Sequence, residues 1–254
     1  MTARRDQHFL VDEQAAERIL SLVDVAEKVV LEVGPGRGVL TRGLLDRGAE
    51  VVAVEIDPVL VEELRSIFAP EIADGSLRLI EGDAVRVDLP PFEIVVSNLP
   101  YSISSPITFR LLQIGFTEAI LMYQAEFADR MVARIGTPAC GRLTVMVQTY
   151  ADVKRCLHIP PKAFLPRPQV HSTVVRIIPR EPPYPIKDQK RYADVVKALF
   201  SHRRKTVRNG LKSARGIFGG EVVDRMTASI PPEVLALRPE ALSLREFAEI
   251  ANVM

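Results

Sequence analysis

The chain has 254 residues, 47% of them apolar, and a net formal charge of only +1, which suits a full hydrophobic core in one large domain or in one domain with a small appendage. It contains no apolar run near the ~20 residues that a membrane span requires, and no apolar stretch follows the first residues, so we expect neither a membrane protein nor a secretory signal. The two cysteines form no CxxC pair and the four histidines lie far apart, so we expect a cytoplasmic protein without a disulfide framework or a metal site.

Short apolar segments alternate with amphipathic segments over the first half of the chain. The pattern predicts a helix after the N-cap Asp12, and Asp57-Pro58 supplies the N-cap and first residue of a helix that ends before Pro70. Further helices are expected at 39–47, 105–114 and 124–135, and strands at 29–31, 51–54, 77–80, 94–97 and 119–122. Strands that alternate with helices predict a parallel, doubly wound α/β sheet.

The alternation changes after residue 135. Residues 143–149 and 173–178 are expected to form an antiparallel pair of strands that closes one edge of the sheet. A proline-rich segment at 181–185 predicts a domain boundary, so we expect one domain over residues 1–181 and a second, all-helical one over 182–254. The last helix is expected to open with a capping box at 243–246.

Positive charge is concentrated between Lys187 and Arg215, where ten lysines and arginines face only two aspartates. The rest of the chain is correspondingly acidic. Such segregation is typical of a surface that binds a polyanion, and nucleic acid is the favoured partner. The alternative is an ordinary solvated helix face.

A glycine loop, Glu32–Gly38, follows the first strand of the sheet and precedes a helix. It reads Glu-x-Gly-x-Gly-x-Gly, which departs from the G-x-G-x-x-G form of dinucleotide sites and fits a loop that holds the amino-acid part of S-adenosylmethionine. Glu55 and Asp83 end the next two strands, where carboxylates can accept from ribose hydroxyls and from an adenine amino group. The alternatives are an ordinary strand–helix turn and helix N-caps.

Residues 98–101 read Asn-Leu-Pro-Tyr directly after an apolar strand. The Asn98 side-chain oxygen and the Leu99 carbonyl can both accept hydrogen bonds from a planar amino group. Pro100 stiffens the turn, and Tyr101 offers a ring on which an extruded base can stack. The group suits an exocyclic amine such as N6 of adenine; the alternative is a polar turn that caps a strand.

Taken together, these segments resemble the small-subunit ribosomal RNA adenine N6,N6-dimethyltransferase family, from one end of the chain to the other. The matching segments are Gln7–Asp12, Glu32–Gly38, Glu55–Asp57, Gly82–Ala84, Asn98–Tyr101, Phe164–Ser172, Phe200–Thr206 and Arg238–Ser243. The last two favour the small-subunit branch over the related methylases of large-subunit RNA. The chain departs from the family pattern at Asp6, where the family usually has glycine.

The resemblance implies a Rossmann-like, class I S-adenosylmethionine-dependent methyltransferase sheet with a small, basic, helical RNA-binding domain. The activity it implies is N6,N6-dimethylation of two adjacent adenosines near the 3′ end of small-subunit RNA, by a monomer that acts on that RNA or on immature small subunits and needs no metal. The implied catalytic residues are Asn98, Leu99, Pro100 and Tyr101, the cofactor-binding residues His8, Leu10, Gly34, Glu55, Asp83 and Asn98, and the substrate-binding residues Tyr101, Phe164, Arg203, Arg204 and Lys205.

Two alternatives stay open at this point. One is a ribosome-assembly factor that acts mainly by binding immature small subunits, and the other is a large-subunit RNA adenine methyltransferase. A DNA amino-methyltransferase is disfavoured because no additional target-recognition region is present. The spacing of histidines and glycines supports neither a metal hydrolase nor a nicotinamide oxidoreductase.

Overall fold

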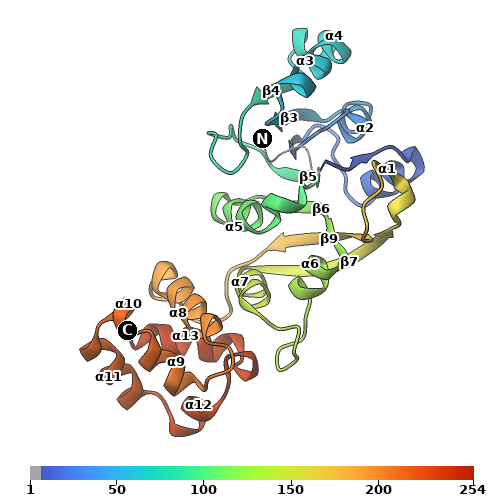
Figure 1. The fold of residues 1–254 in the computed structure, drawn as a ribbon. Coiled ribbons are helices and arrows are strands. Elements are labelled where there is room, and N and C mark those ends of the chain that lie inside the picture. The colour runs from blue at the N-terminus through green and yellow to red at the C-terminus, as the bar shows by residue number, and fades with distance from the viewer. Residues whose placement is uncertain (1–6) are drawn as a thin grey trace. The chain divides into compact units, whose positions relative to one another are not determined.

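The computed structural model describes residues 7–254 (Figure 1); Asp6, where the resemblance departs, lies outside them. The chain divides into two compact units. The first, the sheet unit, comprises the residues up to Ala128 and Asp152–Pro179. The second, the helical unit, comprises Asp129–Ala151 and Arg180–Met254.

The main sheet has seven strands in the order β4-β3-β2-β5-β6-β9-β7. The five strands β2 to β6 are parallel to one another and contain the predicted apolar runs. Strand β9 pairs with β6 in the antiparallel sense. The predicted doubly wound sheet is therefore confirmed. The strands are β2 Val29–Val33, β3 Glu50–Glu55, β4 Leu77–Glu81, β5 Ile94–Asn98, β6 Glu118–Gln124, β7 Ala151–Ile159 and β9 Ser172–Pro179.

Helices on the sheet unit begin where the sequence places their caps. Asp12 accepts from the Ala15 amide at 3.0 Å, and Asp57 accepts from the Val59 amide at 3.0 Å with Pro58 as the first helical residue. The helices are α1 Glu13–Leu20, α2 Val39–Leu45, α3 Pro58–Ile67, α4 Ala69–Ala73, α5 Ser104–Ile114 and α6 Ala125–Met131, with short 3₁₀ turns at η2 Tyr101–Ile103 and η3 Pro161–Ala163. The last residues of α6 belong to the helical unit.

A second, two-stranded sheet ties the amino-terminal segment to the loop before β9. β1, Phe9–Leu10, runs antiparallel to β8, Phe164–Leu165, and the Val11 amide donates to the Ala163 carbonyl at 2.9 Å. Leu10 is buried in the same apolar cluster as the strands of the main sheet. The segment is thereby held over the sheet unit by backbone pairing and by burial.

The helical unit has its own apolar core around α8, Gln189–Ser201, to which the buried Tyr192, Val195 and Leu199 contribute. The Tyr192 hydroxyl lies 2.7 Å from Thr149 Oγ1, which satisfies both buried groups. The capping box at Ser243 and Glu246 is confirmed. The helices are α7 Arg142–Tyr150, α8 Gln189–Ser201, α9 Val207–Ser213, α10 Arg215–Phe218, α11 Gly220–Ser229, α12 Pro232–Ala236 and α13 Leu244–Asn252, with a 3₁₀ turn, η4, at Pro239–Ala241.

The expected strand at 143–149 is wrong, because this segment forms helix α7. Its threonines satisfy their hydroxyls in the helix: Thr144 donates to the Arg130 carbonyl at 2.6 Å and Thr149 to the Val145 carbonyl at 2.7 Å. Packing against α8 and α13 thus outweighs the strand preference of a segment rich in β-branched residues. The strand at the sheet edge is β7, which lies next to β9.

The expected boundary at 181/182 needs a correction for the same reason. The chain passes between the units at Pro179/Arg180, close to the predicted position, but residues 129–151 also belong to the helical unit because they carry α7. Arg180 contributes to this packing, since its guanidinium donates to the Gln148 carbonyl at 2.7 Å. The helical unit is therefore built from two separate stretches of chain.

Candidate active site

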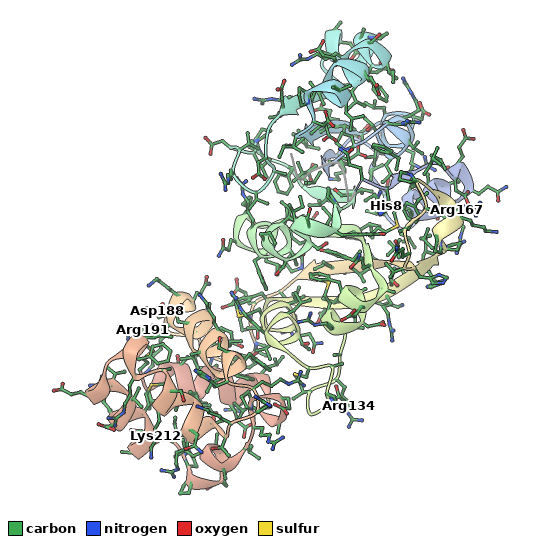
Figure 2. The ribbon with its side chains drawn as sticks, in the orientation of Figure 1. His8, Arg134, Arg167, Asp188, Arg191 and Lys212 are labelled. Carbon is green, nitrogen blue, oxygen red and sulfur yellow. The ribbon has the colours of Figure 1, made fainter. Side chains whose placement is uncertain are left out.

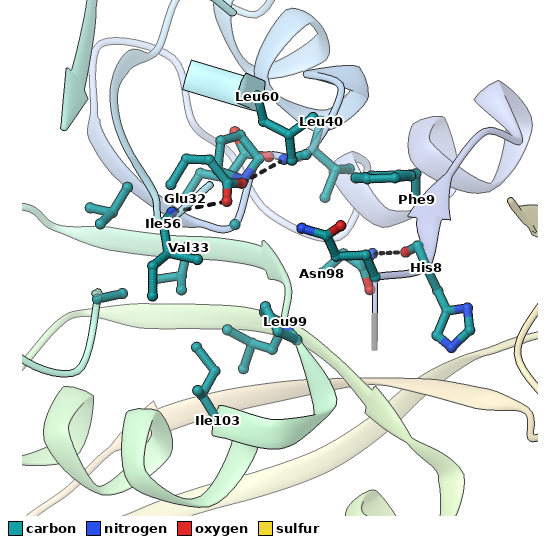
Figure 3. Close-up of a pocket in the computed structure, with 18 of the residues that line it drawn as sticks. His8, Phe9, Glu32, Val33, Leu40, Ile56, Leu60, Asn98, Leu99 and Ile103 are labelled. Atoms are coloured by element: carbon teal, nitrogen blue, oxygen red, sulfur yellow. Dashed lines mark hydrogen bonds between the residues drawn. The ribbon is translucent and has the colours of Figure 1, made fainter. Parts of the chain in front are cut away.

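A pocket lies at the carboxyl ends of β2, β3 and β5, and the amino-terminal residues His8 and Phe9 line one side of it (Figure 3). This is the edge at which open α/β sheets bind their ligands. Nine of the predicted site residues line it together: His8, Leu10, Gly34, Glu55, Asp83, Asn98, Leu99, Pro100 and Tyr101. Segments that are far apart in the sequence are thus brought to one cavity, as the resemblance implies.

The glycine loop after β2 needs its glycines for backbone shape. Gly34, Gly36 and Gly38 have φ angles of +69°, +58° and +78°, which side chains other than glycine rarely adopt. A Cβ atom on Gly36 would lie 2.8 Å from Cδ1 of Phe9. The loop therefore leaves room for a ligand and for the amino-terminal segment only as long as Gly36 has no side chain.

Glu55 ends β3 and points its carboxylate into the loop. Its Oε1 accepts from the amides of Ile56 at 2.9 Å and Asp57 at 3.0 Å, and its Oε2 accepts from the Gly36 amide at 3.3 Å. Burial raises the pKa of Glu55, and the backbone N–H groups oppose that rise. The remaining lone pairs can accept from ligand hydroxyls, which is the donor pattern of a ribose.

Glu32 lies deeper in the pocket wall and is fully buried. The Thr41 hydroxyl donates to its Oε2 at 2.6 Å. The pKa of Glu32 is raised from near 4.5 to about 8, and burial is the largest cause of this rise. A carboxyl group in this position can balance a positive charge brought by a ligand, such as an ammonium group.

Asp83 lines the pocket just after β4, and it also stabilises its own turn. Its Oδ1 accepts from the Val85 amide at 2.9 Å, and its Oδ2 lies 3.4 Å from Nε of Arg86. Asp83 thus closes its own turn and also lines the pocket, but it is not a helix N-cap, because a turn rather than a helix follows it. One carboxylate can serve both, since each oxygen has more than one lone pair.

The amide of Asn98 has a defined orientation. Its Nδ2 donates to the His8 carbonyl at 3.1 Å, and because a carbonyl oxygen only accepts, the Oδ1 atom must take the opposite side (Figure 3). The Leu99 amide donates to the Met122 carbonyl at 3.3 Å, which anchors the turn to β6. The bond to His8 therefore fixes the orientation of the Asn98 amide, and Asn98 is one of the residues that line the pocket.

Two contacts hold the Tyr101 side chain, one at its hydroxyl and one at its ring. Its hydroxyl lies 2.9 Å from Ser172 Oγ, and its ring centroid lies 5.7 Å from that of His8. His8 is in turn held by its Nδ1–H, which donates to the Pro166 carbonyl at 2.8 Å. Burial raises the pKa of Tyr101, so the phenol stays neutral and able to stack near pH 7.

Phe164, which is predicted to be a substrate-binding residue, does not line the pocket. The residue is 1% exposed and packs into the apolar core through β8, where it pairs with Leu10. A phenylalanine ring gains more from burial under the sheet than from exposure beside it. Its position supports β1 and the amino-terminal segment instead.

The predicted substrate-binding cluster lies after α8 in the helical unit. The guanidinium of Arg203 already has partners within the protein, because one of its NH2 groups donates to the Pro138 carbonyl and its Nε lies 3.8 Å from Glu240. Arg204 and Lys205 are exposed, and Lys205 Nζ donates to Ser213 Oγ at 2.8 Å. Lys212 lies on α9 of the same unit (Figure 2).

Both acidic residues of the basic segment form ion pairs within α8 or at its start. Asp188 lies 3.4 Å from Nε of Arg191, both labelled in Figure 2, and Asp194 lies 3.9 Å from Nζ of Lys190. The part of the segment after α8 therefore keeps most of the excess positive charge. Such exposed pairs contribute little to folding stability.

Sequence reasoning missed two residues that shape the site. Ser172, which anchors the Tyr101 hydroxyl, stands at the end of the matched loop motif, so its position in that motif was an available signal. Ile56 lines the pocket with 55% of its surface exposed, next to Glu55. An apolar residue directly after a strand-ending carboxylate is a signal for a flat, apolar part of a ligand.

Among residues 7–254, no group of three potential metal-ligating side chains comes together. In the same described part of the chain, no helix has the length and apolar content needed to cross a membrane.

The pocket residues fit S-adenosylmethionine, because backbone space at the glycines, a ribose acceptor and a buried acid occur in one cavity. This pocket on a sheet of this strand order defines a class I S-adenosylmethionine-dependent methyltransferase. The chain belongs to the ribosomal RNA adenine dimethylase family, whose model matches residues 2–252.

Curated relatives agree with this assignment. A probable ribosomal RNA small subunit methyltransferase A of Methanospirillum hungatei is 59% identical over 99% of this chain and 98% of its own length. A protein of the same description from Halobacterium salinarum is 46% identical over 98% of this chain and 88% of its own length.

Two solved structures cover both units. A dimethyladenosine transferase from Plasmodium falciparum is 26% identical, covers 96% of each chain and gives a TM-score of 0.80. The 23S rRNA methyltransferase ErmE is 27% identical, covers 96% of this chain and 99% of its own, and gives a TM-score of 0.68. A dimethyladenosine transferase and a 23S rRNA methyltransferase therefore both share this fold.

Proposed function

We propose that the protein dimethylates N6 of two adjacent adenosines near the 3′ end of small-subunit ribosomal RNA, acting as a cytoplasmic monomer on immature small subunits. The orientation of the Asn98 amide carries the proposal, because the bond from its Nδ2 to the His8 carbonyl leaves Oδ1 as the atom that would accept from an exocyclic amine. The curated relatives, which are described as small subunit methyltransferases, support the choice of RNA.

The residues of the 98–101 turn would prepare the amine for attack. When bound, S-adenosylmethionine supplies an electrophilic methyl group. Asn98 Oδ1 and the Leu99 carbonyl would accept from the two N6 hydrogens, which favours a pyramidal nitrogen with a localised lone pair. Tyr101 would hold the extruded base by stacking. Placement then provides most of the acceleration, and the proton leaves to solvent after transfer.

The experiment that tests the proposal uses a labelled methyl donor with three substrates: unmethylated small subunits, large subunits and free ribosomal RNA. Digestion to nucleosides is expected to show labelled N6,N6-dimethyladenosine from small subunits. Label in large subunits alone would favour a large-subunit RNA adenine methyltransferase, the alternative that the similarity to ErmE supports. Binding to small subunits without any transfer would favour the assembly-factor alternative.

The basic cluster gives a separate prediction. Replacing Arg204 and Lys205 together by alanine is expected to weaken RNA binding and to flatten its salt dependence, because two phosphate contacts are lost. The slope of log K against log salt should fall by about 0.7 to 0.9 for each lost contact. Arg203 is left intact, since it is bonded to Pro138 and Glu240.

Binding titrations at several salt concentrations measure this slope. A matched control removes two exposed positive charges elsewhere in the helical unit, with Arg225→Ala and Arg245→Ala. We expect the control to keep the wild-type slope. Equal slopes for the two double variants would show that the cluster after α8 does not contact phosphate.

A further inference from the structure

An exposed pair of histidine rings lies on the sheet unit, outside the pocket lining. His158 is the penultimate residue of β7, and His171 directly precedes β9. Their ring centroids are 4.5 Å apart with an interplanar angle of 26°, so the rings are stacked. Both residues are exposed. Two aromatic rings are thus held face to face at the surface, where a third flat ring can join them.

The pair has no evident part in holding the fold together. Ile159, next to His158, and Val174, three residues after His171, belong to the apolar core of the sheet unit, whereas both histidines are exposed. Within residues 7–254, no hydrogen bond of either imidazole is found. Stacked imidazoles also direct their nitrogen lone pairs in nearly parallel planes, which disfavours their sharing one metal ion.

The pair lies at the same edge of the sheet as the pocket. β9 runs antiparallel to β6 with Ser172 opposite Gln124, so the start of β9 meets the carboxyl end of β6, beside the carboxyl end of β5. Neighbouring strands are about 4.8 Å apart, which places β9 and β7 roughly 10 to 15 Å from the strand that carries Asn98. A nucleotide chain spans that distance in a few residues.

Two contacts hold the backbone at and beside His171, and the second of them reaches Tyr101. The His171 carbonyl accepts from the Ala125 amide at 2.9 Å, at the point where β6 passes into α6. The adjacent Ser172 lies 2.9 Å from the Tyr101 hydroxyl. His171 therefore has a fixed position relative to Tyr101, and a ligand that contacts both rings meets a preorganised surface.

We propose that the His158–His171 stack is a second base-binding platform, which receives a nucleobase of the substrate RNA a short distance along the strand from the adenosine at Tyr101. The inference rests on the proposed function and adds a positioning site to it. Single-stranded RNA is bound by stacking of unpaired bases on aromatic side chains, histidine among them. With the target base at Tyr101, stacking of this second base fixes the direction of the strand.

The test compares the wild type with the double variants H158A/H171A and H158F/H171F. The substrates are unmethylated small subunits and a single-stranded oligonucleotide with two adjacent adenosines and their flanks. Loss of a stacked base is expected to raise KM at least about fivefold, with a smaller change in kcat. Phenylalanine keeps a stacking face, so H158F/H171F should restore most of the affinity.

Ile178→Ala is the matched control, because Ile178 is exposed on β9 near its other end. Affinity for S-adenosylhomocysteine and the thermal midpoint should match the wild type in all variants, since the rings lie outside the pocket and the core. An unchanged KM in H158A/H171A, or an equal rise in H158F/H171F, would overturn the proposal.

Failure of the proposed function is distinguishable from failure of this platform. If the wild type methylates none of these substrates, the proposed function fails. The same variants are then compared by direct binding of the oligonucleotide. In that comparison, a loss of affinity in H158A/H171A that phenylalanine restores supports the platform, and equal affinities overturn it.

Discussion

Replacing Asn98 by alanine is expected to lower the rate of methyl transfer about 100-fold or more. The substitution removes an acceptor whose orientation is set by the bond to the His8 carbonyl. Removing one preorganised hydrogen-bonding group from an active site costs about 10²- to 10³-fold in rate. Affinity for S-adenosylhomocysteine should change less than about tenfold, because Glu55 and the glycine loop stay in place. Single-turnover methylation and ligand titration measure the two effects separately.

Two further variants sharpen the test at Asn98. Asn98→Asp keeps an oxygen acceptor but cannot donate to the His8 carbonyl, so we expect a rate between those of the wild type and Asn98→Ala. Ser105→Ala changes an exposed side chain in the first turn of α5 and should retain the wild-type rate. A near wild-type single-turnover rate in Asn98→Ala would show that another group accepts from the amine.

Alanine at Gly36 is expected to weaken binding of S-adenosylhomocysteine tenfold or more. The new methyl group would lie 2.8 Å from Cδ1 of Phe9, so either the glycine loop or β1 must move. Either movement disturbs the amide that donates to Glu55 at 3.3 Å. Titration of the purified variant with the ligand measures the loss.

Gly48→Ala separates this effect from backbone strain. Gly48 has a φ of +77°, which lies in the left-handed region like the +58° of Gly36. A Cβ atom on Gly48, however, would meet no atom within 4 Å. Both variants should lose about 1 to 2 kcal/mol of unfolding free energy. Only Gly36→Ala should lose ligand affinity; equal affinities in the two variants would contradict a close approach at Gly36.

The parallel part of the sheet was predictable because its signals are local. Each strand from β2 to β6 is a short apolar run, and caps such as Asp12 and Asp57 mark helix starts next to those runs. The site followed from the same pattern, since side chains that end successive parallel strands must meet at one edge. His8 and Leu10 do not end strands of that sheet, and only the resemblance implied their place in the site.

The errors arose where packing between distant segments decides the outcome. Residues 143–149 are rich in β-branched residues and were expected to form a strand, yet contacts with α8 and α13 make them a helix. Phe164 stands in a loop motif, but pairing of β8 with β1 turns its ring into the core. The contacts of Arg203 with Pro138 and Glu240 were not predictable either, because no local pattern connects these residues to it, and its role in binding substrate stays a prediction.

The buried acid at the foot of the pocket links ligand uptake to hydrogen-ion concentration. With its pKa raised to about 8, Glu32 is mostly protonated near neutrality. A cationic ligand in the cavity favours the carboxylate, so its arrival should expel a proton into the buffer. The affinity for the cationic ligand should then rise as the medium becomes more alkaline, up to about pH 8. The heat of association should vary with the ionisation enthalpy of the buffer.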